Sequence, residues 1–505
     1  MRQLACTGES DADGAGISRG TAARKLHRVA SLLMSAEMWS TAPGERCASR
    51  PGTIRDMTTS IPQHPGSPAR AYPGVQLGAL RLDTPVMLAP MAGVTNPPFR
   101  QLCREQAEAG AASAGFMARR GRGNDAVTND AERPRVPSAS GAGTAGHTTN
   151  RGAGNEAPAG LWVCEMITSR ALIERVPLTM TMIQPDPFDP VRSIQLYGVE
   201  PKVVAEGVRI LVREGWADHI DLNFGCPAPK VTKKGGGAAL PWKLDLFRDL
   251  VNAAVSAAQE ASRDRDTPVP ITVKFRIGVD GDHTTFHDTA RIAEDAGVAG
   301  LTLHGRTLEE HYAGHANWER IAELVEETDL PVFGNGDVFE AEDAADMMAQ
   351  TGCAGIAVGR GCQGRPWLFY DLAAMLHGGT ARREPTLGEV AAIIRRHAEL
   401  SVAHFGNEGR AMRELRKHLV WYVKGYPVGS DTRQRLSHVS TLADLDTVLG
   451  EFDADAPYPP GARGKRSRSG GRKRAHLPEG WLDSRALSPE QREHIREAEL
   501  GISGG

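Results

Sequence analysis

Eight short apolar runs, spaced along the chain with helical stretches between them, constrain the fold more than any other feature. The runs are rich in β-branched residues and read as continuously apolar, as strands buried on both faces do. They are Val86–Pro90, Leu161–Ile167, Ser193–Tyr197, His219–Asn223, Ile271–Arg276, Leu301–His304, Val332–Asn335 and Ile356–Gly359. Eight strands that alternate with amphipathic helices predict a parallel (β/α)8 TIM barrel over residues 71–378. A doubly wound open sheet is the alternative, but such sheets rarely contain eight units this regular.

After residue 378 the pattern is helical only. The stretch "TLGEVAAIIRRHAELSVAHFG" begins with Thr386 and Glu389 at the spacing of a capping box. Two further helical stretches follow, "EGRAMRELRKHLVWYVKGYP" and "SDTRQRLSHVSTLADLDTVLGEF". We therefore expect a small all-helical domain over residues 379–452.

Three stretches have low complexity and no apolar period. Residues 1–70 are rich in Ser, Ala, Gly, Arg and Pro, which predicts a disordered N-terminal extension, and Met57 is a second candidate start. Residues 108–160 interrupt the barrel pattern and are interpreted as a low-complexity insertion. Residues 453–505 include "GARGKRSRSGGRKRAH", with no acidic residue, followed by a weakly helical stretch, and predict a basic, mostly disordered tail.

The bulk composition describes a globular chain: 505 residues, 40% hydrophobic, net charge −3. No apolar run approaches the roughly 20 residues that span a bilayer, and the N-terminus lacks the apolar core of a signal peptide. Seven dispersed cysteines without a CxxC pair favour reduced thiols and no zinc site. We expect a cytoplasmic monomer with no metal and no membrane association.

Polar residues stand where the predicted strands end, at the face that carries the active site in such barrels. The last two turns, "GNGD" (334–337) and "VGRG" (358–361), are rich in glycine. Glycines let backbone N–H groups approach an anion, and Arg360 can add a bidentate contact. Because no Walker lysine motif is present, these turns indicate the phosphate site of a mononucleotide cofactor.

Several segments together resemble one known family. They are "VMLAPMAGVTNPPFRQLCRE", "CEMITSRALIE", "SIQLYGVEP", "HIDLNFGCPAPKVTKKGGGAAL", "ITVKFRIG", "LTLHGRTLEEHYAGHANW", "PVFGNGDV" and "GIAVGRGCQGRPWLF". The chain resembles the tRNA-dihydrouridine synthases, nearest to the bacterial B type, from about Val86 to Phe452. The N-terminal extension, the insertion and the basic tail depart from the family pattern without removing a motif residue.

The resemblance implies an FMN-dependent oxidoreductase that reduces the C5–C6 double bond of specific tRNA uridines with NADPH. It implies that Cys226 donates the proton to C5 while the flavin N5 gives a hydride to C6. It also implies that Asn223 and Arg276 contact the target uracil. The cofactor residues that it implies are Pro90, Met91, Ala92, Gln195, Lys274, His304, Asn335, Gly336, Asp337, Gly359 and Arg360.

The chemistry of the residues agrees with these roles. A lysine such as Lys274 suits the negative charge of a reduced flavin. A thiol with a pKa of ~8.5 is protonated at neutral pH yet can give up its proton. We interpret the glycines and lysines of the loop after Cys226 as residues that let this loop stay mobile and close on a polyanionic substrate. The alternative for Cys226 is a buried apolar residue, and for His304 a hydrogen-bonded core histidine.

A base must leave the RNA stack to reach the bottom of a barrel. Contacts to the RNA backbone must supply the energy that unstacking the base costs. Four basic residues share one helical face of the predicted C-terminal domain: Arg410, Arg413, Lys417 and Lys424. We predict that they bind tRNA and that the basic run 463–474 adds a phosphate contact, although a basic helix face is usually only solvated.

Two other functions are compatible with parts of the sequence. One is an FMN barrel acting on a free pyrimidine, of the dihydroorotate or dihydropyrimidine dehydrogenase kind, which does not explain the basic helical domain. The other is an RNA-binding module without activity, which does not explain the complete set of flavin residues with Cys226.

Overall fold

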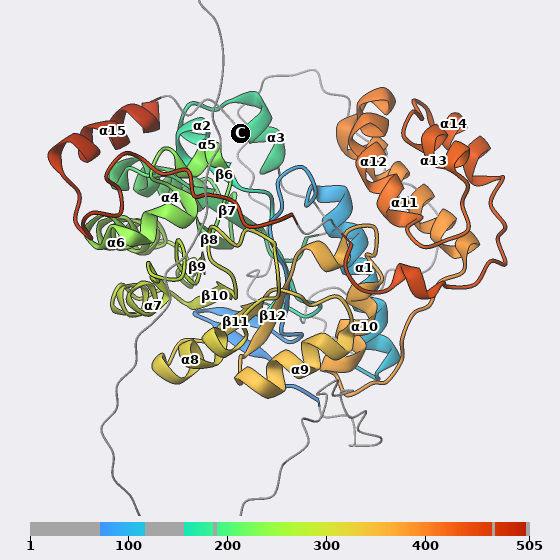
Figure 1. The fold of residues 1–505 in the computed structure, drawn as a ribbon, viewed down its shortest axis with the longest axis horizontal. Helices are drawn as coiled ribbons and strands as arrows, with labels where there is room; N and C mark the ends of the chain where they lie inside the picture. Colours follow the sequence, from blue (N-terminus) through green and yellow to red (C-terminus); the bar gives the residue numbers. More distant parts are fainter. Residues whose placement is uncertain (1–70, 117–155, 185–188, 467–469, 501–505) are drawn as a thin grey trace, which may run out of the picture. The chain divides into compact units, whose positions relative to one another are not determined.

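A closed parallel sheet lies at the centre of the protein. The computed structural model describes residues 71–116, 156–184, 189–466 and 470–500. Its main sheet has the strand order β5-β3-β12-β11-β10-β9-β8-β7-β6, with helices outside it (Figure 1). The strands are β3 (Val86–Leu88), β5 (Leu161–Trp162), β6 (Ile167–Thr168), β7 (Ser193–Tyr197), β8 (His219–Phe224), β9 (Ile271–Arg276), β10 (Gly300–His304), β11 (Val332–Asn335) and β12 (Gly355–Val358).

The second predicted strand is divided into β5 and β6, and together they close the barrel. Leu161 of β5 pairs in parallel with Met87 of β3, whereas Ile167 of β6 pairs with Leu196 of β7. Val163 forms a single parallel bridge to Ser193 between these two ends. Counted as one position, β5 and β6 give eight parallel strands, so the predicted (β/α)8 barrel is confirmed.

Helices alternate with the strands and bury one apolar stripe each. In α4 (Pro201–Arg213), for example, Val204, Val208 and Leu211 are buried at helical spacing, and Pro201 occupies the first turn. The other helices of the barrel region are α1 (Pro97–Ser113), α2 (Ser169–Ile173), α3 (Pro177–Met182), α5 (Pro229–Thr232), α6 (Leu244–Ala261), α7 (Phe286–Asp295), α8 (Glu319–Glu327), α9 (Ala341–Thr351) and α10 (Leu368–Leu376).

A three-stranded sheet covers the N-terminal end of the barrel. It consists of β1 (Val75–Leu77), β2 (Leu80–Leu82) and β4 (Glu156–Ala157), in the order β1-β2-β4. Leu77 and Leu82 are fully buried there, in one apolar cluster with Met87 and Phe333 of the barrel strands. With this end filled, only the opposite end of the barrel can admit a ligand.

The expected insertion is shorter on both sides than residues 108–160. Helix α1 continues to Ser113, with Gly110 packed against the backbone of Tyr370 on α10, and β4 begins at Glu156. The alanine-rich sequence of 107–113 read as low complexity, but it is the last part of a buried helix. Residues 117–155 and the N-terminal extension 1–70 lie outside the described residues.

The helical domain after the barrel has its own apolar core. Its helices are α11 (Leu387–Phe405), α12 (Glu408–Tyr422), α13 (Ser430–Leu436) and α14 (Leu442–Leu449). Thr386 and Glu389 form the predicted capping box at the start of α11. The core of this domain includes Trp367, which follows the last barrel strand, so the domain is continuous with the barrel.

The tail differs from the expectation that residues 453–505 are mostly disordered. Residues 470–499 pack on the barrel and end in helix α15 (Pro489–Leu500). Trp481 is 1% exposed and Glu499 is 2% exposed. The expectation was wrong because single buried anchors such as these, separated by polar residues, leave no periodic apolar signal.

Candidate active site

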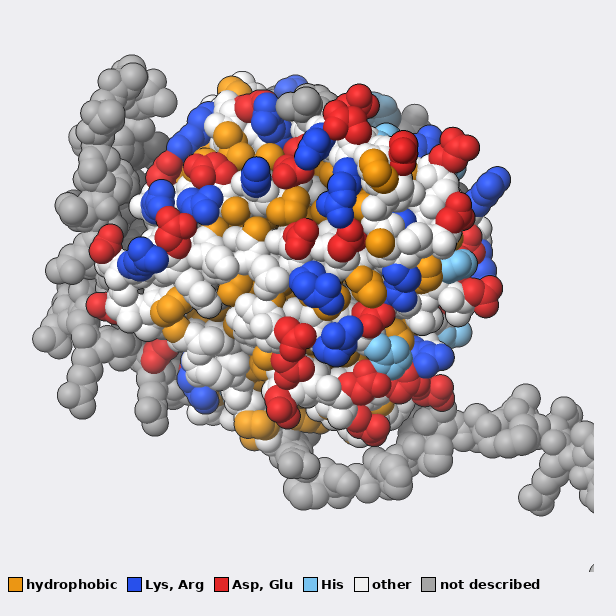
Figure 2. Space-filling view, turned by 90° about the vertical axis from the view of Figure 1, so that its left-hand side faces the viewer, with side chains coloured by type: hydrophobic (Ala, Val, Ile, Leu, Met, Phe, Trp, Pro, Cys, Tyr) orange, Lys and Arg blue, Asp and Glu red, His pale blue; other side chains and the backbone are white. Residues whose placement is uncertain are grey.

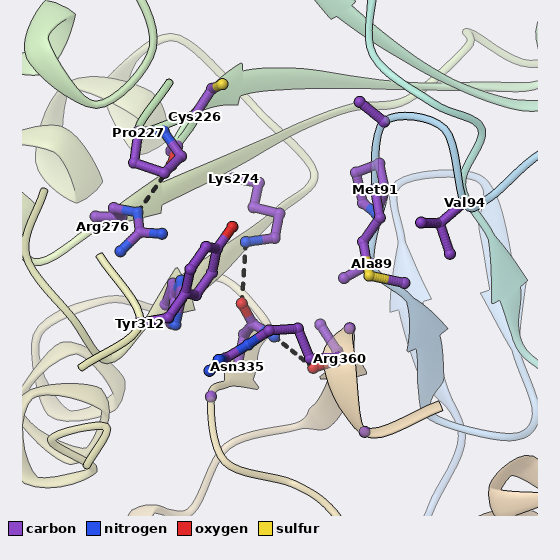
Figure 3. A pocket seen from close by; sticks show the side chains of 18 of the residues that line it. Ala89, Met91, Val94, Cys226, Pro227, Lys274, Arg276, Tyr312, Asn335 and Arg360 are labelled. Carbon is purple, nitrogen blue, oxygen red and sulfur yellow. Dashed lines mark hydrogen bonds between the residues drawn. The ribbon is translucent and has the colours of Figure 1, made fainter. Parts of the chain in front are cut away.

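A cavity of about 570 Å³ opens at the C-terminal ends of the barrel strands. All of the sequence-predicted catalytic, cofactor and substrate residues line it: Pro90, Met91, Ala92, Gln195, Asn223, Cys226, Lys274, Arg276, His304, Asn335, Gly336, Asp337, Gly359 and Arg360. Figure 3 shows Cys226 and Arg276 on one side and Met91 on the other, with Lys274 and Asn335 between them. Because they come from the ends of seven different strands, barrel closure brings them together.

Lys274 and Asn335 fix each other at the centre of the cavity. The Lys274 Nζ donates to Asn335 Oδ1 at 3.1 Å, and Asn335 Nδ2 donates to the carbonyl of Ala357 at 2.7 Å (Figure 3). The amide of Asn335 therefore has one orientation, with its oxygen toward the lysine. A rigid donor results, suited to an acceptor atom of a bound ring.

Asp337 lines the cavity and pairs with the buried Arg306. Arg306 Nη2 lies 2.7 Å from both carboxylate oxygens, and the backbone N–H of Ala316 donates to one of them at 2.7 Å. Asp337 has φ 59°, in the left-handed region that costs a non-glycine residue energy. The ion pair offsets that strain and neutralises the acid, so the turn can approach an anion.

The cavity concentrates buried positive charge. Burial, together with the neighbouring Arg276, lowers the pKa of Lys274 to about 8, while Asp221 opposes the shift. Burial also lowers the pKa of Arg276 to about 10. Burial, with Arg276 and Lys274 nearby, holds the pKa of His304 well below its usual range, so its imidazole is neutral. An anionic ligand would offset the desolvation of these buried cations, which fits a phosphate-bearing cofactor.

Cys226 lies on a loop whose start is held by side chains of neighbouring strands. The Oδ1 of Asn223 accepts from the N–H groups of Gly225 at 3.1 Å and Cys226 at 3.0 Å. Arg276 Nε donates to the carbonyl of Gly225 at 2.8 Å. Burial raises the pKa of the Cys226 thiol, while Ala228, Arg276 and Lys230 oppose the rise, so the thiol is protonated at neutral pH.

The glycines after Cys226 allow the loop to pack closely, and the mobility that the sequence suggested stays a prediction. A Cβ on Gly237 would lie 2.5 Å from the Cys226 carbonyl oxygen, and Gly237 has φ 55°. A Cβ on Gly236 would overlap the hydroxyl of Tyr197. The N–H of Ala238 donates to the Cys226 carbonyl at 3.1 Å. The loop is therefore folded back on the cysteine.

The two predicted uracil contacts already have partners inside the protein. Asn223 accepts from two N–H groups and also donates from Nδ2 to Gln195 Oε1 at 2.7 Å. Gln195 in turn donates to Asp221 at 2.7 Å. Arg276 Nη1 donates to the carbonyls of Thr307 and His311, each at 2.9 Å. Both side chains still line the cavity, and both also hold its loops in place.

Tyr312 is a cavity residue that the sequence-based site omitted. Its ring lies 4.3 Å from the Arg360 guanidinium carbon and 5.5 Å from that of Arg276. The ring thus separates and orients two cations at the mouth (Figure 3). The signal was present, because Tyr312 opens the Y-x-G-x-A-x-W motif after "HGRT".

The four predicted RNA-binding residues lie on or just after α12, and none lines the cavity. Arg413 is exposed, and Arg410 lies over the Phe405 ring at 4.7 Å. Lys417 pairs with Glu414 at 2.8 Å, and Lys424 donates to the carbonyl of Lys465. The same helix ends near Trp421, which lines the cavity and was not predicted.

Within the described residues, no group of three or more His, Cys, Asp or Glu side chains could hold a metal ion. In the same part of the chain, every helix is too short or too polar to cross a membrane.

Comparison with known proteins finds a family for this arrangement. The family model described as "Dihydrouridine synthase (Dus)" matches residues 87–455. A protein of Mycobacterium tuberculosis named "Probable tRNA-dihydrouridine synthase" is 46% identical over 411 residues, which cover 81% of this chain and 92% of that protein. A protein of Mycobacterium leprae with the same name is 46% identical over 397 residues, covering 78% and 95%. The "tRNA-dihydrouridine synthase B" of Xanthomonas campestris is 32% identical over 385 residues, covering 75% and 96%.

The matched range begins in β3 and includes the other barrel strands, the cavity and helices α11 to α14. It ends before the residues of α15. On this match, and on the relatives that share most of their length with it, the chain belongs to the dihydrouridine synthase family.

Proposed function

We propose that the protein is a tRNA-dihydrouridine synthase that reduces the C5–C6 double bond of uridines in tRNA, with FMN as cofactor and NADPH as reductant. Members of its family are FMN-dependent oxidoreductases acting on that bond. The observation that carries the proposal is the combination of a protonated Cys226 thiol and a buried cationic floor in one cavity.

The residues present fit FMN. Gly336, Asp337, Gly359 and Arg360 form two adjacent turns at the end of the cavity where an anion would be neutralised, and these would hold the phosphate. Lys274 and the oriented Asn335 would face the polar edge of the ring, while the apolar Met91 and Ala92 would lie along its face. Bound FMN supplies a hydride to C6 of the uracil.

Cys226 would supply the proton to C5 from the opposite side of the base. Burial keeps the thiol protonated before the reaction, and the Arg276 and Lys230 charges stabilise the thiolate that is left. Arg276 and Asn223 hold the backbone on either side of Gly225, so the sulfur keeps its place as its charge changes. Both would also orient the uracil.

The helical domain would bind the tRNA while one base enters the cavity. Arg413 is exposed on α12, and Arg410, Lys417 and Lys424 lie along or just after the same helix, which places positive charge beside the Trp421 edge of the mouth. Such contacts would supply the few kcal/mol needed to extrude a base. Because tRNA and NADPH are cytoplasmic substrates, we place the enzyme in the cytoplasm. We also propose that it acts as a monomer.

A free-pyrimidine reductase is not favoured, because the family match extends through α14 rather than ending with the barrel. The test incubates FMN-loaded protein and NADPH with tRNA lacking dihydrouridine, or with uridine, uracil or orotate. Nucleoside mass spectrometry should find dihydrouridine in the tRNA only. Turnover of a free pyrimidine with unmodified tRNA would overturn the proposal, and a parallel NADH series tests the reductant.

A further inference from the structure

Residues 470–499, here called the C-terminal segment, lie beyond the range of the family match, which ends at residue 455. Instead of extending from the protein, the segment runs past the loop that follows Cys226 and continues into α15. It is the red part of the chain beside α4 and α6 in Figure 1. Its first residues contact Glu309 and Glu310, and the rest of it contacts the loop after Cys226 and the residues that flank that loop.

Trp481 is the central contact. Its Nε1 donates to the carbonyl of Ala239 at 2.9 Å, and the side chain is 1% exposed. The ring lies so close to Gly235 that a Cβ there would be 2.5 Å from it. Gly235 and Ala239 bracket the glycine turn that folds back on Cys226 through the bond from Ala238. One side chain of the C-terminal segment therefore touches both ends of that turn.

Lys243 anchors the segment on one side of the turn. The residue is fully buried, and its Nζ donates to the carbonyls of Ser484 at 2.7 Å and Ala486 at 3.1 Å. The Nζ also lies 5.0 Å from the centre of the Trp481 ring. A buried ammonium is costly without acceptors, so the segment's carbonyls and the lysine stabilise each other.

Glu499 anchors the other side, at the end of β7. Its Oε2 accepts from the N–H of Val199 at 2.9 Å, and the residue is 2% exposed. Two residues earlier, Tyr197 places its buried hydroxyl against Gly236. Burial raises the pKa of Tyr197, and the nearby Glu499 and Cys226 raise it further.

The face of the protein that carries this segment does not look like an RNA-binding surface. In Figure 2, Lys and Arg side chains alternate with Asp and Glu across that face instead of forming a patch of one sign. Arg485 pairs with Asp288 at 2.8 Å and Arg492 with Asp245 at 2.7 Å. Arg485 and Arg492 thus hold the segment to the barrel, and their charges are paired with acidic side chains.

We propose that the C-terminal segment is a positioning element of the active site, in which Trp481 holds the glycine turn so that the Cys226 thiol points into the cavity. The inference rests on the proposed role of Cys226 as proton donor. Trp481 touches neither the substrate nor the cofactor. It acts through Gly235, Ala239 and the bond from Ala238 to Cys226.

The test compares full-length, FMN-loaded Trp481→Ala, Trp481→Phe and Arg496→Ala. Arg496 pairs only with the neighbouring Glu493 in the described part of the chain, so its variant is the control from the same C-terminal segment. Trp481→Ala should lower kcat for dihydrouridine formation by about ten-fold or more, because small displacements of a reacting group have effects of this size. The KM for tRNA and NADPH oxidation without tRNA should stay within about two-fold, as neither uses the thiol.

A second readout follows Cys226 directly. Iodoacetamide labelling, measured by mass spectrometry of the Cys226 peptide, should be several-fold faster in Trp481→Ala than in wild type, since the turn no longer covers the thiol. Trp481→Phe keeps the ring and should restore most of kcat, and Arg496→Ala should match wild type. If Trp481→Ala does not fold, Glu499→Ala, which removes the acceptor of the Val199 N–H, takes its place with the same expected directions.

Wild-type kcat and labelling in the folded Trp481 or Glu499 variant would overturn the positioning role. A raised KM for tRNA with unchanged kcat would overturn it too, in favour of an RNA contact. The test also distinguishes failure of the proposed role of Cys226 from failure of the proposed role of Trp481. If Cys226 is not the proton donor, Cys226→Ala forms dihydrouridine at a normal rate, whatever the Trp481 variants do.

Discussion

The side-chain oxygen of Asn223 accepts hydrogen bonds from the backbone N–H groups of Cys226, at 3.0 Å, and of Gly225. The second-last residue of strand β8 therefore sets the direction in which the chain leaves the strand. Gln195 fixes the Asn223 amide from the other side at 2.7 Å. The position of the proposed proton donor thus depends on a chain of contacts that begins inside the barrel.

Replacement of Asn223 by alanine should separate cofactor binding from chemistry. Two N–H groups would lose their acceptor, at a cost of about 1–3 kcal/mol each where they stay buried. We expect wild-type FMN content and a kcat reduced at least about ten-fold. Single-turnover dihydrouridine formation with pre-reduced enzyme measures the effect. A normal rate in Asn223→Ala would contradict the positioning of Cys226 by this side chain.

Lys274 should make FMN affinity depend on pH. Its pKa is lowered to about 8 in the cofactor-free protein. Below that pH the ammonium is present before and after binding, so affinity is constant. Above it the lysine is neutral until an anion raises its pKa again, so binding must take up a proton and affinity falls as pH rises. Fluorescence titration with FMN should show this decline in wild type but not in Lys274→Met.

Arg360 should contribute to the retention of FMN through the phosphate. Its guanidinium lies over the Tyr312 ring and 3.9 Å from Asp337, at the glycine turns. Arg360→Ala should weaken FMN binding by about ten- to a hundred-fold, the worth of a charge-assisted hydrogen bond. Arg360→Lys should recover part of it, because lysine keeps the charge without the planar fork. Equal flavin content of all three proteins after gel filtration would argue against a phosphate contact.

The insertion can be removed only within limits that the fold sets. Replacing residues 117–155 by a short Gly-Ser linker should leave melting temperature and activity close to wild type, since loop entropy grows only slowly with length. Replacing residues 108–160 should lower the melting temperature, because that deletion removes Gly110 and Ala111 from the α1–α10 packing and Ala157 from β4. Calorimetry of the two variants compares them directly, and equal melting temperatures would contradict this boundary.

The barrel and its site were predictable because both depend on local patterns. Each strand, such as Ile271–Arg276, is a short apolar run that ends in polar residues, and closure of the barrel gathers those ends. The division of the second strand into β5 and β6 was not predictable, because it follows from pairing with two neighbours distant in sequence.

The C-terminal segment was missed for a different physical reason. Its stability comes from a few deep contacts, such as those of Trp481 and Glu499, made with residues more than 200 positions away. A run like "PEGWLDSRALSPE" has neither the helical nor the strand period that reveals burial. The phosphate contact expected of the basic run 463–474 stays a prediction, and Arg485 and Arg492, which lie beyond that run, form ion pairs within the protein.

Cys226→Ala tests the central claim most directly. The FMN-loaded variant and wild type are given NADPH and tRNA lacking dihydrouridine, and both flavin reduction and dihydrouridine formation are followed. The variant should oxidise NADPH at the wild-type rate, because that step needs no thiol, while dihydrouridine formation falls at least about a hundred-fold, as expected on loss of a general acid. Dihydrouridine formation at a rate near wild type would contradict the assignment of Cys226 as the proton donor.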